Sequence, residues 1–213
     1  MPLDNFYGQT FVAFIDISGF KQLMKEGRAE GALDIFYTAG YNNTNREIGG
    51  IFVSDCGILF WGNDLSSSSI PEKRHALESL LSSIRNINHE MCHQDFILTT
   101  SIAYGYFSFQ ERIETAYIRK NPIYGDAYLN SFLDNENGTP KIQPGQCRIV
   151  TRDIPSEVLD FDFLKRRSSS DNHYYYYWMV NKENDIRRFE EDYKDSYNLK
   201  YGGMRQALQR YSQ

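Results

Sequence analysis

The segment Phe11-Val-Ala-Phe-Ile-Asp16 constrains the fold of this chain more than any other stretch. Five apolar or small residues run directly into an aspartate, and such a short apolar run is typical of a strand buried on both faces of a sheet. Because sheets present ligand-binding side chains at the ends of their strands, Asp16 is predicted to lie at a functional edge. The alternative is that Asp16 only caps the helix that follows.

The residues after Asp16 predict a phosphate site beside it. Ser18 and Gly19 begin a short helix predicted over residues 19–27. Backbone N–H groups in the first turn of a helix point outward and can bind phosphate. A carboxylate for a cation next to amides for phosphates is the combination that a metal–nucleotide site requires.

The composition restricts the class of protein. A chain of 213 residues with 41% hydrophobic residues is long enough to bury a core. Its net charge of −5 disfavours nucleic acid as a partner, because a phosphate backbone needs a basic surface. The three cysteines, at positions 56, 92 and 147, show no paired spacing and fit a reducing compartment. No apolar run approaches a membrane span and no signal begins the chain, so we expect a cytoplasmic protein without a membrane partner.

The apolar pattern predicts an α+β fold in which helices cover a mostly antiparallel sheet. After the first helix, the predicted elements are a helix at 30–46, a hairpin with strands at 51–53 and 58–61, a helix at 71–92, a strand at 96–107, a helix at 125–136 and a strand at 147–151. Beyond residue 152 we expect a loop at 165–171, a strand at 173–180 and helices at 183–194 and 203–211.

The hairpin supplies a second carboxylate, Asp55, at its tip. A hairpin that pairs beside the first strand brings its tip next to the end of that strand. Asp16, Asp55 and the carbonyl oxygen of Ile17 are therefore expected to hold two Mg²⁺ or Mn²⁺ ions. Two such ions can activate an attacking oxygen and neutralise a leaving phosphate. The alternative is that Asp55 is an ordinary turn residue.

Three motifs carry a resemblance to a known family: Phe14-Ile-Asp-Ile-Ser-Gly-Phe20, Val53-Ser-Asp-Cys-Gly57 and Ile123-Tyr-Gly-Asp-Ala-Tyr-Leu-Asn130. In this order they resemble the class III nucleotide cyclases over roughly residues 9–151. The resemblance implies a ferredoxin-like catalytic domain at 1–151 and a C-terminal extension at 152–213, packed on the same domain or at a dimer interface. It also implies a head-to-tail homodimer in which both protomers build each active site.

The same resemblance assigns roles to single residues. It makes Asp16 and Asp55 the two metal ligands. It gives triphosphate binding to the backbone of Ile17, Ser18, Gly19 and Phe20. Asn130 corresponds to the nucleotide-binding asparagine of the helix in that family.

Three positions depart from the family pattern. Ile51 stands where the purine cyclases carry a lysine that recognises adenine, and Ile123 stands where they carry an aspartate. Asp134 stands where they carry the arginine that steadies the transition state. An apolar residue cannot hydrogen-bond a base edge, and polar recognition is where nucleotide specificity arises. Adenylate cyclase activity of the usual kind is therefore disfavoured.

A substitute for the missing arginine is needed in an active enzyme, because charge develops on the α-phosphate. Arg112, Arg119 and Lys120 precede the third motif and are candidates. The alternative is a solvated basic loop.

A stand-alone cyclase with its metal pair but without the purine-binding lysine is similar to the pyrimidine cyclases of the Pycsar antiphage systems. That similarity implies conversion of UTP, or less favoured CTP, to the 3′,5′-cyclic monophosphate and pyrophosphate. The product would activate a separate effector protein. A smaller base would suit a pocket narrowed by Ile51 and Phe52. Two alternatives stay open: an adenylate or guanylate cyclase with an atypical base pocket, and a catalytically silent module for nucleotide binding or dimerisation, which Asp134 favours.

Two further motifs have simpler interpretations. His89-Glu-Met-Cys-His93 matches a zinc-helix pattern, but no third ligand follows at a suitable spacing, so a polar cluster at a helix end is favoured. Alternate residues of a strand face opposite sides, so half of the run Tyr174–Tyr177 is expected in the core or a dimer interface.

Overall fold

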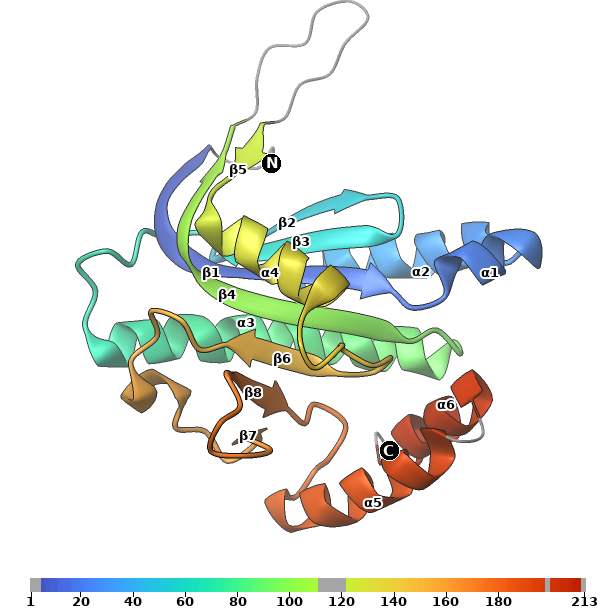
Figure 1. Cartoon of the computed structure of the whole chain (residues 1–213). Coiled ribbons are helices and arrows are strands. Elements are labelled where there is room, and N and C mark those ends of the chain that lie inside the picture. The colour runs from blue at the N-terminus through green and yellow to red at the C-terminus, as the bar shows by residue number, and fades with distance from the viewer. Residues whose placement is uncertain (1–4, 111–121, 198–199, 212–213) are drawn as a thin grey trace, which may run out of the picture.

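A single mixed sheet with helices on both faces organises the chain (Figure 1). The computed structural model describes residues 5–110, 122–197 and 200–211. The strands lie in the order β2-β3-β1-β4-β6-β8-β7, and β5 pairs with β4 off this path. All the pairings are antiparallel except that of β4 with β6. The predicted α+β fold is confirmed.

The central strand is β1 (Phe6–Ile17), which pairs along its whole length with β4 (Leu98–Phe109) and on its other side with β3 (Cys56–Trp61). Its side chains alternate between two apolar clusters. Phe11, Ala13 and Ile15 enter the larger cluster, and Val12 and Phe14 enter the smaller one. Both faces of β1 are thus buried as predicted. Asp16 lies at the C-terminal end of the strand, and its side chain belongs to neither cluster.

Helices cover the two clusters from opposite sides. The larger cluster packs under α1 (Phe20–Lys25), α2 (Ala29–Asn42) and α3 (Ile70–His93). The smaller cluster packs under α4 (Asp126–Asn137), which lies on β1 and β4. Ser69 and Glu72 form a capping box at the start of α3. The remaining elements of this part are β2 (Ile48–Val53), β5 (Ile123–Tyr124) and β6 (Cys147–Val150).

The C-terminal residues continue the same sheet. Beyond β6 it gains β8 (His173–Tyr176) and β7 (Leu164–Lys165). The other elements here are η1 (Ser156–Leu159), η2 (Glu183–Asp185), α5 (Ile186–Tyr197) and α6 (Lys200–Tyr211). Helices α5 and α6 contribute Phe189, Tyr193 and Leu208 to the larger cluster.

Two predictions for this region were wrong in detail. The strand expected at 173–180 ends at Tyr176, because the chain then turns and the indole of Trp178 donates to the Gly145 carbonyl at 2.8 Å. Lys165, expected in a loop, ends β7 instead. The expected alternation does hold within β8, where His173 and Tyr175 are buried and their neighbours are half-buried.

The described part of the chain contains no helix long and apolar enough to cross a membrane. Cys56, Cys92 and Cys147 are all free thiols.

A buried ion pair joins α4 to the sheet. The Arg148 guanidinium of β6 is fully buried and donates to both carboxylate oxygens of Asp134, at 2.8 Å each. Ser101 of β4 donates to the same carboxylate, and the His173 ring of β8 lies 2.8 Å from it. The fifth member, Asp171, lies 2.9 Å from the other ring nitrogen of His173. Asp134, which the resemblance placed at the transition-state position, therefore binds α4 to three strands.

The electrostatics of Asp134 follow from these contacts. Burial alone would raise its pKa, but the hydrogen bonds from His173, Arg148 and Ser101 outweigh burial and lower the pKa below the usual 3.8. The lowered pKa makes the contribution of Asp134 to stability complete above pH 4. Stability is lost as the pH falls through the folded-state pKa, because the unfolded chain binds the proton first.

We expect Asp134→Asn to lower the free energy of unfolding by about 3 to 5 kcal/mol, because it leaves the Arg148 charge buried without a counter-charge. Urea denaturation at pH 7 measures this. Asp160→Asn is the matched control, because that carboxylate is 88% exposed and its pair with Arg74 spans 3.9 Å. Equal losses in the two variants would contradict the assigned role of the buried pair.

Candidate active site

Asp16 and Asp55 are brought together by pairing of the hairpin with β1. In the register of β1 with β3, Asp16 stands opposite Cys56, the residue after Asp55. The Ile17 N–H then donates to the Asp55 carbonyl at 3.0 Å, which fixes the hairpin tip to the end of β1. The structure thus places the two carboxylates in one site.

The tip itself is a two-residue turn, Ser54-Asp55, closed by the pair Val53 and Cys56. Ser54 has a φ of 54°, in the left-handed region that non-glycine residues rarely adopt. The Tyr37 hydroxyl of α2 donates to the Ser54 carbonyl at 3.0 Å and supports this conformation. Strain of this kind persists only where the surroundings enforce it, and it is concentrated at functional sites.

The charge at this edge is uncompensated. Burial raises the pKa of Asp16 to about 7, with further contributions from the negative charges of Asp55 and Glu136. No ion pair from Lys, Arg or His reaches Asp16 or Asp55 within residues 5–110, 122–197 and 200–211. A half-buried carboxylate beside other carboxylates is stabilised by a bound cation.

Two residues near the pair were not predicted. The Cys56 thiol donates to an Asp16 carboxylate oxygen at 3.6 Å, and its pKa is raised to about 12 by burial and by the two aspartates. Glu136 belongs to α4 and adds a third carboxylate close enough to influence Asp16. Cys56 lay inside a motif already singled out, whereas no local pattern indicates that Glu136 approaches β1.

The donor set fits a hard divalent cation. Carboxylate and carbonyl oxygens are the ligands that Mg²⁺ and Mn²⁺ prefer. The described residues contain no group of three or more His, Cys, Asp or Glu side chains arranged to hold a metal ion, so protein side chains alone do not complete the coordination. Sites for these ions usually combine one or two carboxylates with water and substrate phosphates, which Asp16 and Asp55 match.

The predicted phosphate amides are available only in part. The Ser18 N–H donates to the Ile97 carbonyl at 2.8 Å, so that amide is already occupied and its assignment to phosphate is corrected. Gly19 takes a φ of 75° at the start of α1, and Phe20 follows it. The Ser18 hydroxyl oxygen is buried with no hydrogen-bond partner in the described structure, which leaves one polar atom at the turn free for a ligand. Phosphate binding by Gly19 and Phe20 stays a prediction.

Ile51 lies on the same face of the sheet as Asp16. It packs against the smaller cluster, with Phe14 and the half-buried rings of α4. Phe52 faces the other way and packs against Phe36 with ring centroids 5.0 Å apart, so the prediction that it narrows the base pocket was wrong. Successive residues of a strand point to opposite faces, and only one of the two can therefore line this site.

Asn130 lies on α4 and is half-buried. No hydrogen bond joins it to Asp16 or Asp55 among the residues described. Arg112, Arg119 and Lys120 fall outside the described residues. The zinc alternative gains no support: the His89 ring accepts from Arg85 at 3.5 Å and packs on Trp178, within the polar end of α3.

Solved structures share this fold at low sequence identity. A rhodopsin–guanylyl cyclase catalytic core with converted specificity, in complex with ATPαS, matches at a TM-score of 0.56 and 11% identity, over 80% of this chain and 95% of that one. The fold is that of the class III nucleotide cyclase domains. A dimeric guanylyl cyclase domain of the RhoGC fusion protein from the aquatic fungus Blastocladiella emersonii matches at 0.54 and 11%, over 80% and 94% of the two chains.

Another solved structure matches over almost the whole of this chain. A bacterial light-regulated adenylyl cyclase matches at a TM-score of 0.56 and 13% identity, over 96% of this chain and 58% of that chain. No protein-family model matches the sequence, and neither does any curated protein. The cyclase-like motifs are therefore supported by the fold rather than by overall sequence similarity.

The raised pKa of Asp16 predicts the pH dependence of the metal-free protein. The folded chain binds this proton more tightly than the unfolded chain, so stability falls as the pH rises from about 4 to about 7. Asp16→Asn is expected to remove that loss and to be more stable than the parent at pH 8, by an amount on the order of 2 to 4 kcal/mol. Urea denaturation in EDTA at pH 5 and pH 8 measures it.

Asp34→Asn, an exposed change on α2, is the matched control and should follow the parent at both pH values. Mn²⁺ should restore the stability of the parent at pH 8 and leave the stability of Asp16→Asn unchanged, because a ligand stabilises only the state that binds it. The same pH dependence in the parent and in Asp16→Asn would show that Asp16 is not desolvated as described.

Proposed function

We propose that this protein is a metal-dependent nucleotide cyclase that acts on a pyrimidine nucleoside triphosphate, UTP in preference to CTP. The observation that carries the proposal is the convergence of Asp16 and Asp55 at one edge of a class III cyclase fold, with no cation paired to either among the described residues. The substrate 3′-oxygen would attack the α-phosphorus, the bond from that phosphorus to the bridging oxygen would break, and pyrophosphate would leave. The hydroxyl proton would pass to solvent.

Bound Mg²⁺ or Mn²⁺ would supply Lewis-acid stabilisation of the phosphoryl oxygens. Asp16 and Asp55 would hold the ions, with the Ile17 carbonyl as a further ligand. Gly19 and Phe20 would offer amides to the phosphates, and Asn130 would position the nucleotide. The burial that raises the pKa of Asp16 also strengthens its attraction to a cation, because the local dielectric is low.

The pyrimidine preference rests on Ile51. It is half-buried on the site face, among apolar side chains, and offers no donor to a base edge. The neighbouring rings of Tyr128 and Phe132 stack at 6.2 Å with a 27° angle between their planes, on the same cluster. These apolar and aromatic side chains would pack against a small flat base. The antiviral role, with a separate effector activated by the cyclic product, rests on the resemblance of the motifs alone.

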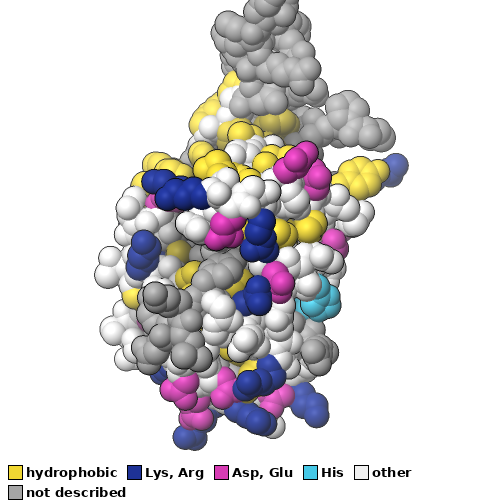
Figure 2. All heavy atoms as spheres, turned by 90° about the vertical axis from the view of Figure 1, so that its right-hand side faces the viewer, with side chains coloured by type: hydrophobic (Ala, Val, Ile, Leu, Met, Phe, Trp, Pro, Cys, Tyr) yellow, Lys and Arg dark blue, Asp and Glu magenta, His cyan; other side chains and the backbone are white. Residues whose placement is uncertain are grey.

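A homodimer with shared active sites is part of the proposal. Leu129 and Leu133 form an exposed stripe on the outer side of α4, 50% and 45% exposed, and Val53 beside the hairpin tip is 63% exposed. Figure 2 shows hydrophobic side chains gathered toward the top of one face, with charges spread below. Of the structures with this fold, one guanylyl cyclase domain is described as a non-canonical dimer and another, from the same fusion protein, as monomeric. A monomeric mass by light scattering, at the concentration used for activity, would contradict the dimer.

A catalytically silent module is the second candidate. It is favoured by Asp134, which binds Arg148 inside the fold and leaves α4 without a cation at the expected transition-state position. Arg148 itself cannot replace that cation, because it is fully buried and bonded to Asp134 and to the Pro140 carbonyl. An adenylate or guanylate cyclase is the third candidate, since the neighbouring folds include both kinds.

The deciding experiment incubates the purified chain with Mn²⁺ and each of the four ribonucleoside triphosphates separately, and identifies products by mass. We expect a cyclic pyrimidine monophosphate, reduced about a hundredfold or more in Asp16→Ala and in Asp55→Ala. Asp34→Ala, an exposed change on α2, is the matched control and should keep full activity. A cyclic purine product would support the third candidate, and no product from any triphosphate would support the silent module.

The role of Ile51 is tested in the same assay. Ile51→Lys places a donor on the site face, so we expect the ratio of UTP to ATP turnover to fall about tenfold or more. Tyr41→Lys adds the same charge at an 82% exposed position on α2, away from the site face, and should leave the ratio unchanged. An unchanged ratio in Ile51→Lys would remove Ile51 from the base pocket.

A further inference from the structure

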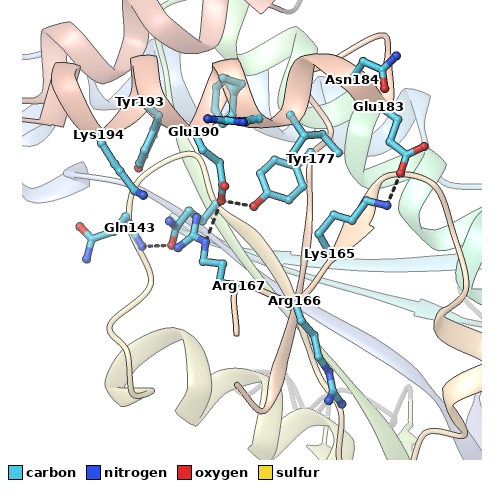
Figure 3. Close-up of a pocket in the computed structure, with 14 residues that line it drawn as sticks. Gln143, Lys165, Arg166, Arg167, Tyr177, Glu183, Asn184, Glu190, Tyr193 and Lys194 are labelled. Carbon is cyan, nitrogen blue, oxygen red and sulfur yellow. Dashed lines mark hydrogen bonds and ion pairs between the residues drawn. The ribbon is translucent and has the colours of Figure 1, made fainter. Parts of the chain in front are cut away.

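A hollow of about 950 Å³ lies between α5 and the segment that contains β7 (Figure 3). Its walls come from the C-terminal residues and from Gln143 and Gln146. Neither Asp16 nor Asp55 lines it, so it is separate from the candidate active site. Its volume is that of a site for a small organic molecule.

Positive charge predominates in this hollow. Five cationic side chains line it, against the two carboxylates Glu183 and Glu190; the cations are Lys165, Arg166, Arg167, Arg187 and Lys194. The whole chain carries a net charge of −5, so this excess of positive charge is local. A concave surface lined by one sign of charge attracts ligands of the opposite sign.

Three of these cations form ion pairs at exposed positions, and one of the three is Arg187, which pairs with Glu191 at 3.2 Å. The Arg167 guanidinium lies 3.8 Å from the centroid of the Tyr175 ring and 3.3 Å from Glu190, yet its side chain is 37% exposed. Lys165 pairs with Glu183, and both are more than 40% exposed. Exposed pairs of this kind contribute little energy, so a competing anion can take their cations. Lys194 is exposed and has no ion pair or hydrogen bond in the part of the chain that the structure describes.

An aromatic row forms the inner wall. The Phe189 ring lies 6.3 Å from the ring of Tyr177 and 5.6 Å from that of Tyr193. The hydroxyl of Tyr177 donates to Glu190, and that of Tyr193 donates to the Pro144 carbonyl at 2.6 Å, so both rings are held in place. In Figure 3 the side chains of Arg167, Lys194 and Glu190 converge beside this row, and Arg166 points away. The hollow thus has cationic side chains at its rim and aromatic side chains, set at an angle to one another, in its inner wall.

We infer that this hollow is a second binding site, for a phosphorylated small molecule of nucleotide size. Its phosphate would lie among Arg167, Lys194 and Lys165, taking Arg167 and Lys165 from Glu190 and Glu183. Its organic part would lie against Phe189 and its neighbouring rings. The volume exceeds what inorganic phosphate alone would fill, which is why a ligand with both parts is assigned. This inference goes beyond the proposed cyclase activity and does not depend on it.

Isothermal titration calorimetry on the full chain in EDTA tests the inference, with each of the four nucleoside 5′-monophosphates and inorganic phosphate as probes. EDTA removes the divalent cations on which the Asp16 and Asp55 site would depend. We expect at least one nucleotide to bind, with the dissociation constant raised about tenfold or more in Lys194→Glu and in Lys165→Gln. Arg188→Glu is the matched control for Lys194→Glu, because Arg188 is exposed on the same helix and does not line the hollow.

Each other result would overturn the inference. Absence of binding by all four nucleotides would do so. Equal weakening in Lys194→Glu and Arg188→Glu would show only general attraction to a basic helix. Inorganic phosphate binding as tightly as the nucleotides would exclude a role for the aromatic wall. Loss of binding in Asp16→Ala would place the nucleotide in the candidate active site instead. A thermal melt of each variant checks that it is folded.

Discussion

Burial of β1 on both faces is the constraint on which the rest of the structure depends. The strand pairs with β4 along its whole length and with β3 over its C-terminal half, and its side chains fill two separate clusters. A polar side chain in the middle of such a strand would lose its hydration without compensation. The acidic function is therefore confined to the end of the strand, at Asp16. The same pairing with β3 carries Asp55 to that end.

The first strand and the hairpin could be predicted because the sequence patterns that indicate them are local. The apolar run that ends at Asp16 and the two apolar runs on either side of the turn at Asp55 are local patterns, and local patterns determine strands and helices directly. Which of Ile51 and Phe52 faces the site is not local, because it depends on the register between β2 and β3. The mistaken assignment of Phe52 to the base pocket came from treating neighbours in sequence as neighbours in the site. Strand alternation places Ile51 and Phe52 on opposite faces.

Long-range contacts account for what the sequence did not reveal. Asp134 and Arg148 are 14 residues apart, and His173 is 39 residues beyond Asp134. No spacing rule links them, since the contact requires β4, β6 and β8 to lie side by side. Glu136 near Asp16 has the same explanation, because only packing of α4 on β1 brings it there. The hydrogen bond from the Ser18 amide to the Ile97 carbonyl is likewise a contact between residues far apart in the sequence.

The surroundings of Asp16 and Asp134 shift the pKa values of these two carboxyl groups in opposite directions. Both carboxylates are desolvated, which by itself raises the pKa of each. At Asp134 the donors Arg148, His173 and Ser101 outweigh burial, and the pKa is lowered. At Asp16 the neighbours are a thiol and other carboxylates, and the pKa rises to about 7. Among the described residues, the buried Arg148 pairs with Asp134, whereas no cation pairs with Asp16.

That asymmetry argues for a ligand rather than for a structural role at Asp16. A structural carboxylate at the end of β1 would gain stability from a nearby cation or from several backbone donors, as Asp134 does. Asp16 instead raises the free energy of the folded state at neutral pH, and the strained Ser54 turn holds Asp55 beside it. Protonation of Asp16 removes this destabilisation below its raised pKa, and the metal ion that we propose would remove it at higher pH. A divalent cation would do for Asp16 and Asp55 what Arg148 does for Asp134.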